Sequence, residues 1–417
     1  MCSRESRIQV AAGLDLHKSF IVATILTLAG EKLLERFDRT QHGLFALKHW
    51  ILSHKVQVVG CESTSDYWVK IFDLLDPFVR VIVGNARDMK ALSHKKTDKI
   101  DSEFIALLAL KDMIRPSRIF PKEHREFRAT VRLRHRIVQK RTSIKNEIHH
   151  ILDSELFRLS AVLTDIFGKS GNLIMKGILN DMPVNDIMAL LPTSVKKKEE
   201  ALREVMQTAL SEGALARLAS CLRIMKTLNE EIAELTNIST NYAVNNYSRE
   251  FEILRSVPGI GDIVAVTLLA EIGDVRDFST ADKLASWLGI VPRVYQSADK
   301  LHTGSITKRG SKTARWILIQ AAHAAVRARD NDLKTFYLGK KEVIGAGKSI
   351  VGVARKMITI IWHLLINDET YKDNQYRGVK PPKKVYVKVP RETSLEEVLR
   401  LLRDAAVVLK EPDPEIC

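Results

Sequence analysis

The stretch Lys95-Lys96-Thr97-Asp98-Lys99-Ile100-Asp101 leads into the apolar run Phe104-Ile105-Ala106-Leu107-Leu108-Ala109-Leu110. The apolar run predicts a helix, and the spacing of three between Asp98 and Asp101 places both carboxylates on one face near its start. Three lysines surround the two acids, so the stretch is not simply an acidic patch. Two carboxylates at one helix start suit a metal site if further acids reach them.

Two further acids follow runs that we expect to be buried strands. Asp15 comes directly after residues 8–14, and Glu62 comes directly after residues 56–61. Acids from two strand ends and one helix start make an oxygen-only ligand set, which Mg²⁺ or Mn²⁺ prefers. The sequence therefore predicts a metal site formed by Asp15, Glu62, Asp98 and Asp101.

Around these acids the chain alternates between strand and helix patterns. Strand patterns cover residues 8–16, 20–27, 32–37, 56–61 and 80–83, and helix patterns cover 43–53 and 65–75. Three strands followed by alternating helices and strands predict an α/β domain of the ribonuclease-H kind over residues 1–115. In that topology the first and fourth strands are neighbours, which brings Asp15 close to Glu62.

Composition narrows the class of protein. The chain has 417 residues, enough for two or three domains with their own cores, and its net charge is +15. No apolar run of membrane-spanning length and no signal peptide is evident, so we expect a cytoplasmic, nucleoid-associated protein. The four cysteines are far apart in the sequence, which argues against a zinc site and a disulfide framework. The positive charge favours nucleic acid as the partner.

The positive charge concentrates in residues 122–159, which predict a long helix containing Arg128 and Arg132. Apolar positions recur along it at helical spacing, so one interpretation is packing in a helical hairpin or coiled coil. The other is contact with a phosphate backbone, which the shortage of balancing acids in this segment favours. Residues 206–235 carry an apolar stripe suited to packing antiparallel to this helix. We predict a helical, nucleic-acid-binding region over 116–250.

The third region, residues 251–366, contains a glycine turn and a serine-rich basic loop. Gly259 and Gly261 flank one apolar residue between helices, which predicts either a helix-hairpin-helix turn that approaches phosphate or a plain tight turn. The loop after the glycine turn holds Ser297, Ser305 and Ser311 among basic residues, including Arg293, Lys308, Arg309 and Lys312. Serines in such a loop commonly bind phosphate or cap a helix. A serine nucleophile would also need these cations, to neutralise the charge that develops at phosphorus.

These motifs together resemble the Asp-Glu-Asp-Asp (DEDD) insertion-sequence transposases. Residues 13–18, 62–64 and 97–101 are similar to that family's RuvC-like N-terminal domain. Residues 257–261, 288–293 and 306–311 are similar to its C-terminal transposase domain, and all six motifs come in the family's order. The resemblance implies a site-specific DNA recombinase that moves its own insertion sequence.

The resemblance also implies particular roles and partners. The four acids bind Mg²⁺ or Mn²⁺, and a serine, matched best by Ser297, forms a covalent phosphoserine link to DNA. Ser305 and Ser311 stay open as alternatives, because the residue after Ser297 is Ala298 where many relatives have glycine. The implied partners are element-end and target DNA, a non-coding bridge RNA and further copies of the chain as a homodimer or tetramer.

Two alternatives stay open at this point. One is a metal-only junction nuclease that cuts with activated water, and the other is a non-catalytic nucleic-acid-binding protein. An unpaired cluster of four carboxylates would be difficult to keep ionised without metal, which argues against the second. No ATP-binding P-loop is present. The basic, proline-containing tail at residues 367–417 has no predicted role.

Overall fold

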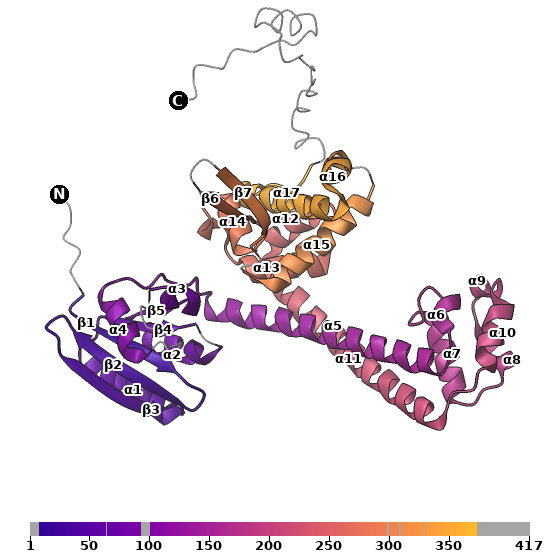
Figure 1. Cartoon of the computed structure of the whole chain (residues 1–417), viewed down its shortest axis with the longest axis horizontal. Coiled ribbons are helices and arrows are strands. Elements are labelled where there is room, and N and C mark those ends of the chain that lie inside the picture. Colours follow the sequence, from indigo (N-terminus) through magenta and orange to yellow (C-terminus); the bar gives the residue numbers. More distant parts are fainter. Residues whose placement is uncertain are drawn as a thin grey trace, which may run out of the picture. The chain divides into compact units, whose positions relative to one another are not determined.

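The computed structural model describes residues 8–63, 65–92, 101–297, 300–307, 310–329 and 331–372, without the side chains of 196, 294–297 and 300–303. The chain forms two compact units, Met1–Phe120 and Pro121–Cys417, each shown in Figure 1. The first is mixed α/β, and the described part of the second is almost entirely helical, consistent with the predicted RuvC-like fold followed by helical regions. The finer boundaries at residues 250 and 366 stay a prediction.

The N-terminal unit is built on one five-stranded sheet with the order β3-β2-β1-β4-β5. Strand β1 is antiparallel to β2 and parallel to β4, β2 is antiparallel to β3, and β4 is parallel to β5. The strands are β1 (Val10–Leu16), β2 (Phe20–Thr27), β3 (Lys32–Asp38), β4 (Val58–Glu62) and β5 (Arg80–Gly84). The five predicted strands and the adjacency of the first and fourth are confirmed.

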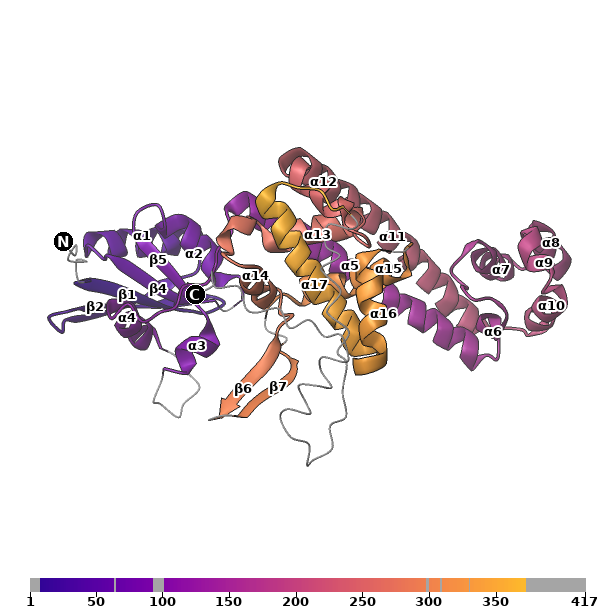
Figure 2. The ribbon, with the colours of Figure 1, turned by 90° about the horizontal axis from the view of Figure 1, so that it is seen from above.

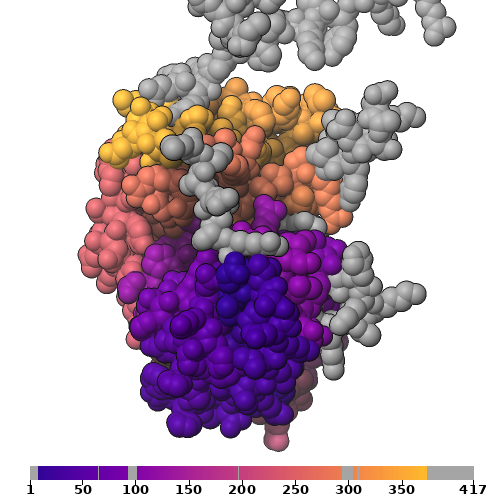
Figure 3. All heavy atoms as spheres, turned by 90° about the vertical axis from the view of Figure 1, so that its left-hand side faces the viewer, coloured from indigo at the N-terminus to yellow at the C-terminus, as the bar shows by residue number. Residues whose placement is uncertain are grey.

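Alternate residues of each strand face two different helical layers. Leu14 and Cys61 belong to the core shared with α1 (Gln41–Ser53) and α2 (Tyr67–Leu75). Ala11 and Val58 belong to the opposite core, with α3 (Ala86–Lys90) and α4 (Ser102–Leu110). Figure 3 shows this unit, in indigo and purple, as a closely packed body. Asp15 and Glu62 have the strand parity of the α4 face.

The second unit contains a long pair of antiparallel helices, α5 (Lys122–Ser154) and α11 (Glu212–Asn246). Arg134 bonds Thr236 and Arg141 bonds Asn229, so positions later in α5 meet positions earlier in α11. The predicted return of the apolar stripe along the basic helix is therefore confirmed. Figures 1 and 2 show a helical module at one end of the pair and a helical bundle at the other.

The end module has a hydrophobic core of its own, formed with the adjoining ends of α5 and α11. Phe157 and Ile174 are fully buried in this core. The module consists of α6 (Leu159–Val162), α7 (Lys169–Leu179), α8 (Val184–Leu190), α9 (Thr193–Lys196) and α10 (Glu199–Gln207). Because the helices of the module share this one core, they pack together as one body.

The bundle at the other end surrounds α17 (Ala346–Asn367), which is an exception to the expected absence of long apolar runs. This helix is long and apolar enough by composition to cross a membrane. Val353, Met357 and Leu364 are nevertheless fully buried against the neighbouring helices, so packing explains the apolar run. The bundle contains α12 (Ser248–Ser256), α13 (Asp262–Ile272), a 3₁₀ turn (Val275–Asp277), α14 (Ala281–Trp287), α15 (Lys312–Arg327), α16 (Asp332–Ile344) and α17 (Ala346–Asn367).

After Pro292 the sequence predicted a polar loop, but the structure has a two-stranded hairpin there. Strands β6 (Pro292–Ser297) and β7 (Lys300–Ile306) pair antiparallel, with Ser297 opposite Lys300. In Figure 2 the hairpin extends away from the helices. Its residues are mostly polar and lack the apolar alternation that marks a strand on a core, which is why the sequence pattern indicated a loop.

Candidate active site and nucleic-acid contacts

Asp15 and Glu62 lie at the same edge of the sheet. Gly13 pairs with Gly60 and Leu14 with Cys61, so continuing this register brings Asp15 opposite Glu62. The Asp15 carboxylate hydrogen-bonds His17, with Oδ2 3.0 Å from Nε2, and is about one-third exposed. The Cys61 side chain faces the opposite core, where burial and then the charge of Glu62 raise its pKa to about 12. That thiol is therefore no candidate metal ligand at neutral pH.

The start of α4 is fixed directly against β1. A Cβ on Gly13 would lie 2.1 Å from the Ser102 carbonyl oxygen and 2.2 Å from the Ala106 nitrogen, so only glycine permits this approach. A buried hydrogen bond of 2.7 Å between the Thr24 and Ser102 hydroxyls ties α4 to β2 as well. Asp101 caps the helix, its Oδ1 accepting the Phe104 N–H at 2.8 Å. The packing thus brings a third carboxylate to the face that holds Asp15 and Glu62.

These acids fit a divalent metal in kind. All are carboxylates, the ligands that Mg²⁺ and Mn²⁺ prefer. Asp98 lies outside the described residues. Among the residues the structure does describe, no three acidic, histidine or cysteine side chains form a group that could hold a metal ion. The metal site formed by Asp15, Glu62, Asp98 and Asp101 stays a prediction.

The three candidate serines have different surroundings. Ser297 ends β6 at the hairpin turn, although its side chain is not described. Ser305 lies exposed on β7. Ser311 is buried, and its Oγ accepts the Ala314 N–H at 3.1 Å as the cap of α15. A hydroxyl already serving as a helix cap is poorly placed to attack a phosphate, so these surroundings favour a hairpin serine.

The glycine turn joins α12 to α13. Gly259 has a φ of 86°, and a Cβ there would lie 2.3 Å from the Ala321 carbonyl oxygen of α15. Its lack of a side chain is therefore explained by helix packing. Gly261, by contrast, is the N-cap of α13 and has nothing within 4 Å of its Cβ position. Of the two predicted phosphate contacts, Gly261 has the more open position.

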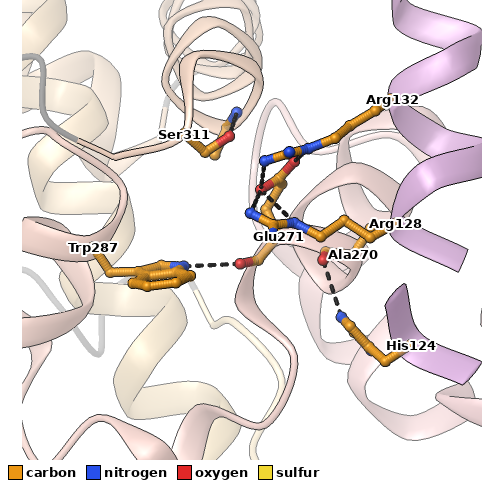
Figure 4. A network of polar contacts seen from close by, with 8 residues as sticks. His124, Arg128, Arg132, Ala270, Glu271, Trp287 and Ser311 are labelled. Carbon is orange, nitrogen blue, oxygen red and sulfur yellow. Dashed lines mark hydrogen bonds and ion pairs between the residues drawn. The ribbon is translucent and has the colours of Figure 1, made fainter. Parts of the chain in front are cut away.

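Arg128 and Arg132 both reach the carboxylate of Glu271 on α13, as Figure 4 shows. Arg128 Nε and Nη2 lie 3.0 and 2.7 Å from Oε2, and Arg132 Nε lies 2.7 Å from Oε1. Glu271 is fully buried, which by itself opposes ionisation, but the hydrogen bond from Arg132 and both positive charges outweigh burial and lower its pKa. A balancing acid for Arg128 and Arg132 is thus supplied by a distant helix.

Two further contacts attach neighbouring helices to α13, one from α14 and one from α5. Trp287 Nε1 donates to the Glu271 carbonyl at 2.9 Å. His124 is buried, with Nε2 3.0 Å from the Ala270 carbonyl oxygen and Nδ1 2.8 Å from the Tyr247 hydroxyl. Because a carbonyl only accepts, Nε2 carries the proton. The predicted nucleic-acid role of Arg128 and Arg132 stays a prediction, and the structure gives both an internal partner.

The remaining predicted cations fall on or beside the hairpin. Arg293 is exposed on β6, and Lys312 is exposed in the first turn of α15. Lys308 and Arg309 lie outside the described residues. Arg315, one turn further along α15, belongs to the same basic run of the sequence, and its Nη1 is buried without a hydrogen-bond partner in the described part of the chain.

Family models match both units. A model of DEDD transposases of the IS110 type, described as "Transposase", matches residues 12–156. The model described as "Transposase IS116/IS110/IS902 family" matches residues 251–338. With the acid-bearing sheet edge and the separate helical unit, these matches define a DEDD-class DNA transposase. The chain belongs to the IS116/IS110/IS902 family of insertion-sequence transposases, whose DEDD domain typically uses a divalent metal.

Curated relatives agree with this assignment. The transposase for insertion sequence element IS1111A from Coxiella burnetii is 26% identical over 287 residues, covering 67% of this chain and 70% of that protein. A probable family 20 transposase from Pseudomonas aeruginosa is 27% identical over 320 residues, covering 76% and 85%. A pilin gene-inverting protein from Moraxella bovis is 23% identical over 342 residues, covering 79% and 87%.

Proposed function

We propose that this transposase cuts and rejoins DNA through a phosphoserine intermediate, guided by a structured non-coding RNA from its own element. The observation that carries the catalytic part is the sheet edge, where Asp15 and Glu62 end neighbouring strands beside the capped start of α4. Asp15, Glu62, Asp98 and Asp101 would hold Mg²⁺ or Mn²⁺. A bound metal ion would supply charge neutralisation at the scissile phosphate.

In this proposal the hydroxyl of Ser297 is the nucleophile. Its Oγ forms a bond to phosphorus while the bond from phosphorus to the 3′ oxygen breaks, leaving a 5′-phosphoserine and a free 3′-hydroxyl. After strand exchange, a 3′-hydroxyl attacks the partner strand's phosphoserine and releases the serine. The phosphoserine ester conserves the energy of the broken phosphodiester bond, so rejoining the strands needs no ATP. The position of Ser297 at the hairpin tip and the capping role of Ser311 support this assignment.

The proposal assigns nucleic-acid contacts to the basic residues of the second unit. Arg293, Lys308, Arg309 and Lys312 would neutralise phosphate near the nucleophile, and Gly261 would offer the open start of α13 to a phosphate. Arg128 and Arg132 would contribute positive charge to the same nucleic-acid surface. Base pairing with the guide RNA would read the sequence, while the protein contacts backbone and shape. The working assembly is a homodimer, paired into a tetramer when two DNA sites meet.

A denaturing-gel assay for covalent adducts tests this proposal. Full-length protein is mixed with labelled element-end DNA, Mg²⁺ and RNA transcribed from the element's non-coding flank. We expect an adduct that requires both RNA and metal, disappears in Ser297→Ala and persists in the matched variant Ser311→Ala. An adduct that persists in Ser297→Ala and disappears in Ser305→Ala would move the nucleophile to β7.

A second set of outcomes concerns the chemistry and the acids. Cleavage without any adduct would replace the serine mechanism with a metal-only nuclease. Asp15→Asn should retain DNA binding and lose cleavage, because the substitution removes a negatively charged ligand with little change in shape. Full cleavage activity in Asp15→Asn would refute the proposed metal site.

A further inference from the structure

The end module carries a cavity of about 870 Å³ where α5, α7 and α11 meet. This volume lies within the range of about 300–1,000 Å³ that is usual for ligand pockets. Most of its lining belongs to residues 167–230, which lie between the two family matches at 12–156 and 251–338. The cavity contains none of the predicted acids or serines, so the proposed reaction does not account for it.

Positive charge dominates the lining of this cavity. Its charged residues are Arg141, Lys145, Lys176, Arg223, Lys226 and Glu230. Glu230 is 4.0 Å from Lys226 on the same helix. Lys145, Lys176 and Arg223 have no carboxylate within ion-pair distance in the part of the chain that the structure describes. Such an excess of cations suits an anionic ligand.

Arg141 contributes a donor that lacks a partner. Its Nη1 donates to Asn229 Oδ1 at 3.0 Å, which fixes the guanidinium at the cavity wall. Its Nε is buried and has no hydrogen-bond partner among the described residues. A buried donor without an acceptor is costly, and an oxygen of a bound anion would remove that cost.

The cavity also presents an aromatic ring among its cations. The Lys145 ammonium lies 4.5 Å from the ring centroid of Phe167, and both residues line the cavity. Asp165 Oδ1 accepts the Phe167 N–H at 2.9 Å and fixes the backbone at this point. Leu179 and Leu222 add apolar surface to the lining. Cations together with an aromatic face are what single-stranded nucleic acids require, for phosphate and base respectively.

We propose that this cavity binds an unpaired nucleotide within a single-stranded nucleic acid. Arg141, Lys176 and Arg223 contact phosphate, while the base stacks on Phe167 after the Lys145 ammonium moves from the ring to phosphate. A duplex keeps its bases stacked inside and has none to offer the ring. An acidic peptide would match the charge but would leave the ring unused. The site is independent of the metal and of Ser297.

The test measures binding of the full-length protein to labelled single strands without Mg²⁺. Oligouridine, oligothymidine and a duplex of the same length are the probes, and fluorescence anisotropy is the readout. The variant Lys176→Ala/Arg223→Ala should weaken single-strand binding about tenfold and reduce the salt slope by about 1.4, since each single-strand phosphate contact contributes about 0.7. The matched control Lys169→Ala/Arg217→Ala removes the same charge from exposed positions of α7 and α11. It should change affinity less than twofold.

Phe167→Leu tests the aromatic contact separately. It should weaken single-strand binding at least about fivefold with the salt slope unchanged, because stacking is lost and no charge is removed. Tighter binding of oligouridine would identify RNA as the ligand, and tighter binding of oligothymidine would identify DNA. Equal losses in the cavity and control variants would overturn the proposal. So would duplex binding as tight as single-strand binding, or polyglutamate competing as well as the oligonucleotides.

Discussion

The carboxylate of Glu271 is the clearest place to test how the bundle holds the long helix pair. Glu271→Gln keeps the shape of the side chain and removes the charge that neutralises Arg128 and Arg132. Removing one partner of a buried ion pair costs about 3–5 kcal/mol. The Arg128 and Arg132 side chains are 20% and 39% exposed, so water can partly rehydrate them and the lower figure of about 3 kcal/mol applies.

In a unit of this size each kcal/mol lowers Tm by roughly 2–4 °C, so we expect a fall of about 6–12 °C at pH 7. The folded-state pKa of Glu271 is lowered, so its stabilisation is complete above the unfolded pKa of about 4.3 and is lost as pH falls through the folded value. The difference between wild type and variant should therefore shrink below about pH 4. Calorimetry across this pH range is the measurement.

The matched control is Glu234→Gln, at an exposed position on α11. We expect it to leave the Tm within about 2 °C of wild type, because surface substitutions usually change stability by less than about 0.5 kcal/mol. A Glu271→Gln variant that melts with wild type at pH 7 would refute the reasoning. A deficit that does not diminish in acid would show that packing, rather than charge, is responsible.

Three further outcomes follow from the geometry. Gly13→Ala should push α4 away from β1, lowering Tm and abolishing DNA cleavage, whereas Gly213→Ala, with nothing near its Cβ position, should do neither. Ser311→Ala should cost about 1 kcal/mol as a lost helix cap, measured by urea unfolding, and a larger loss would point to a further role. Cys61 should resist iodoacetamide at pH 8 in the folded protein and react in denaturant, as peptide mass spectrometry can show. Labelling of the native thiol would contradict its burial.

Local patterns were sufficient to predict the sheet and the positions of two acids. Buried strands have short apolar runs, and Asp15 and Glu62 each lie at the end of such a run. Once the order of the strands was predicted, the two acids were expected to lie close together. The antiparallel return of α11 along α5 was likewise visible as an apolar stripe. These features repeat at the period of a strand or a helix, which a sequence displays directly.

Pairings between distant residues could not be predicted in this way. Nothing local to Arg128 or Arg132 indicates that Glu271 on another helix will neutralise them. Gly259 appeared suited to phosphate, yet its contact is with the backbone of α15. The β6–β7 hairpin is polar along its length, so neither strand produces an apolar alternation. For the arginines and Gly259 the cause is a partner far away in the sequence, whereas for the hairpin it is the missing apolar alternation.

Helix α5 also fixes the distance between two regions of the second unit. It continues without interruption from the residues that hold Glu271 to those that line the end-module cavity. Arg128 and Lys145 are nearly five turns apart on it, so about 25 Å of helix separates the two positions. Adding one residue would rotate everything beyond it by about 100°, whereas adding seven to both α5 and α11 would lengthen the spacing by two turns and nearly preserve the facing surfaces. The length of this helix pair thus sets the distance between the Glu271 ion-pair network and the end-module cavity.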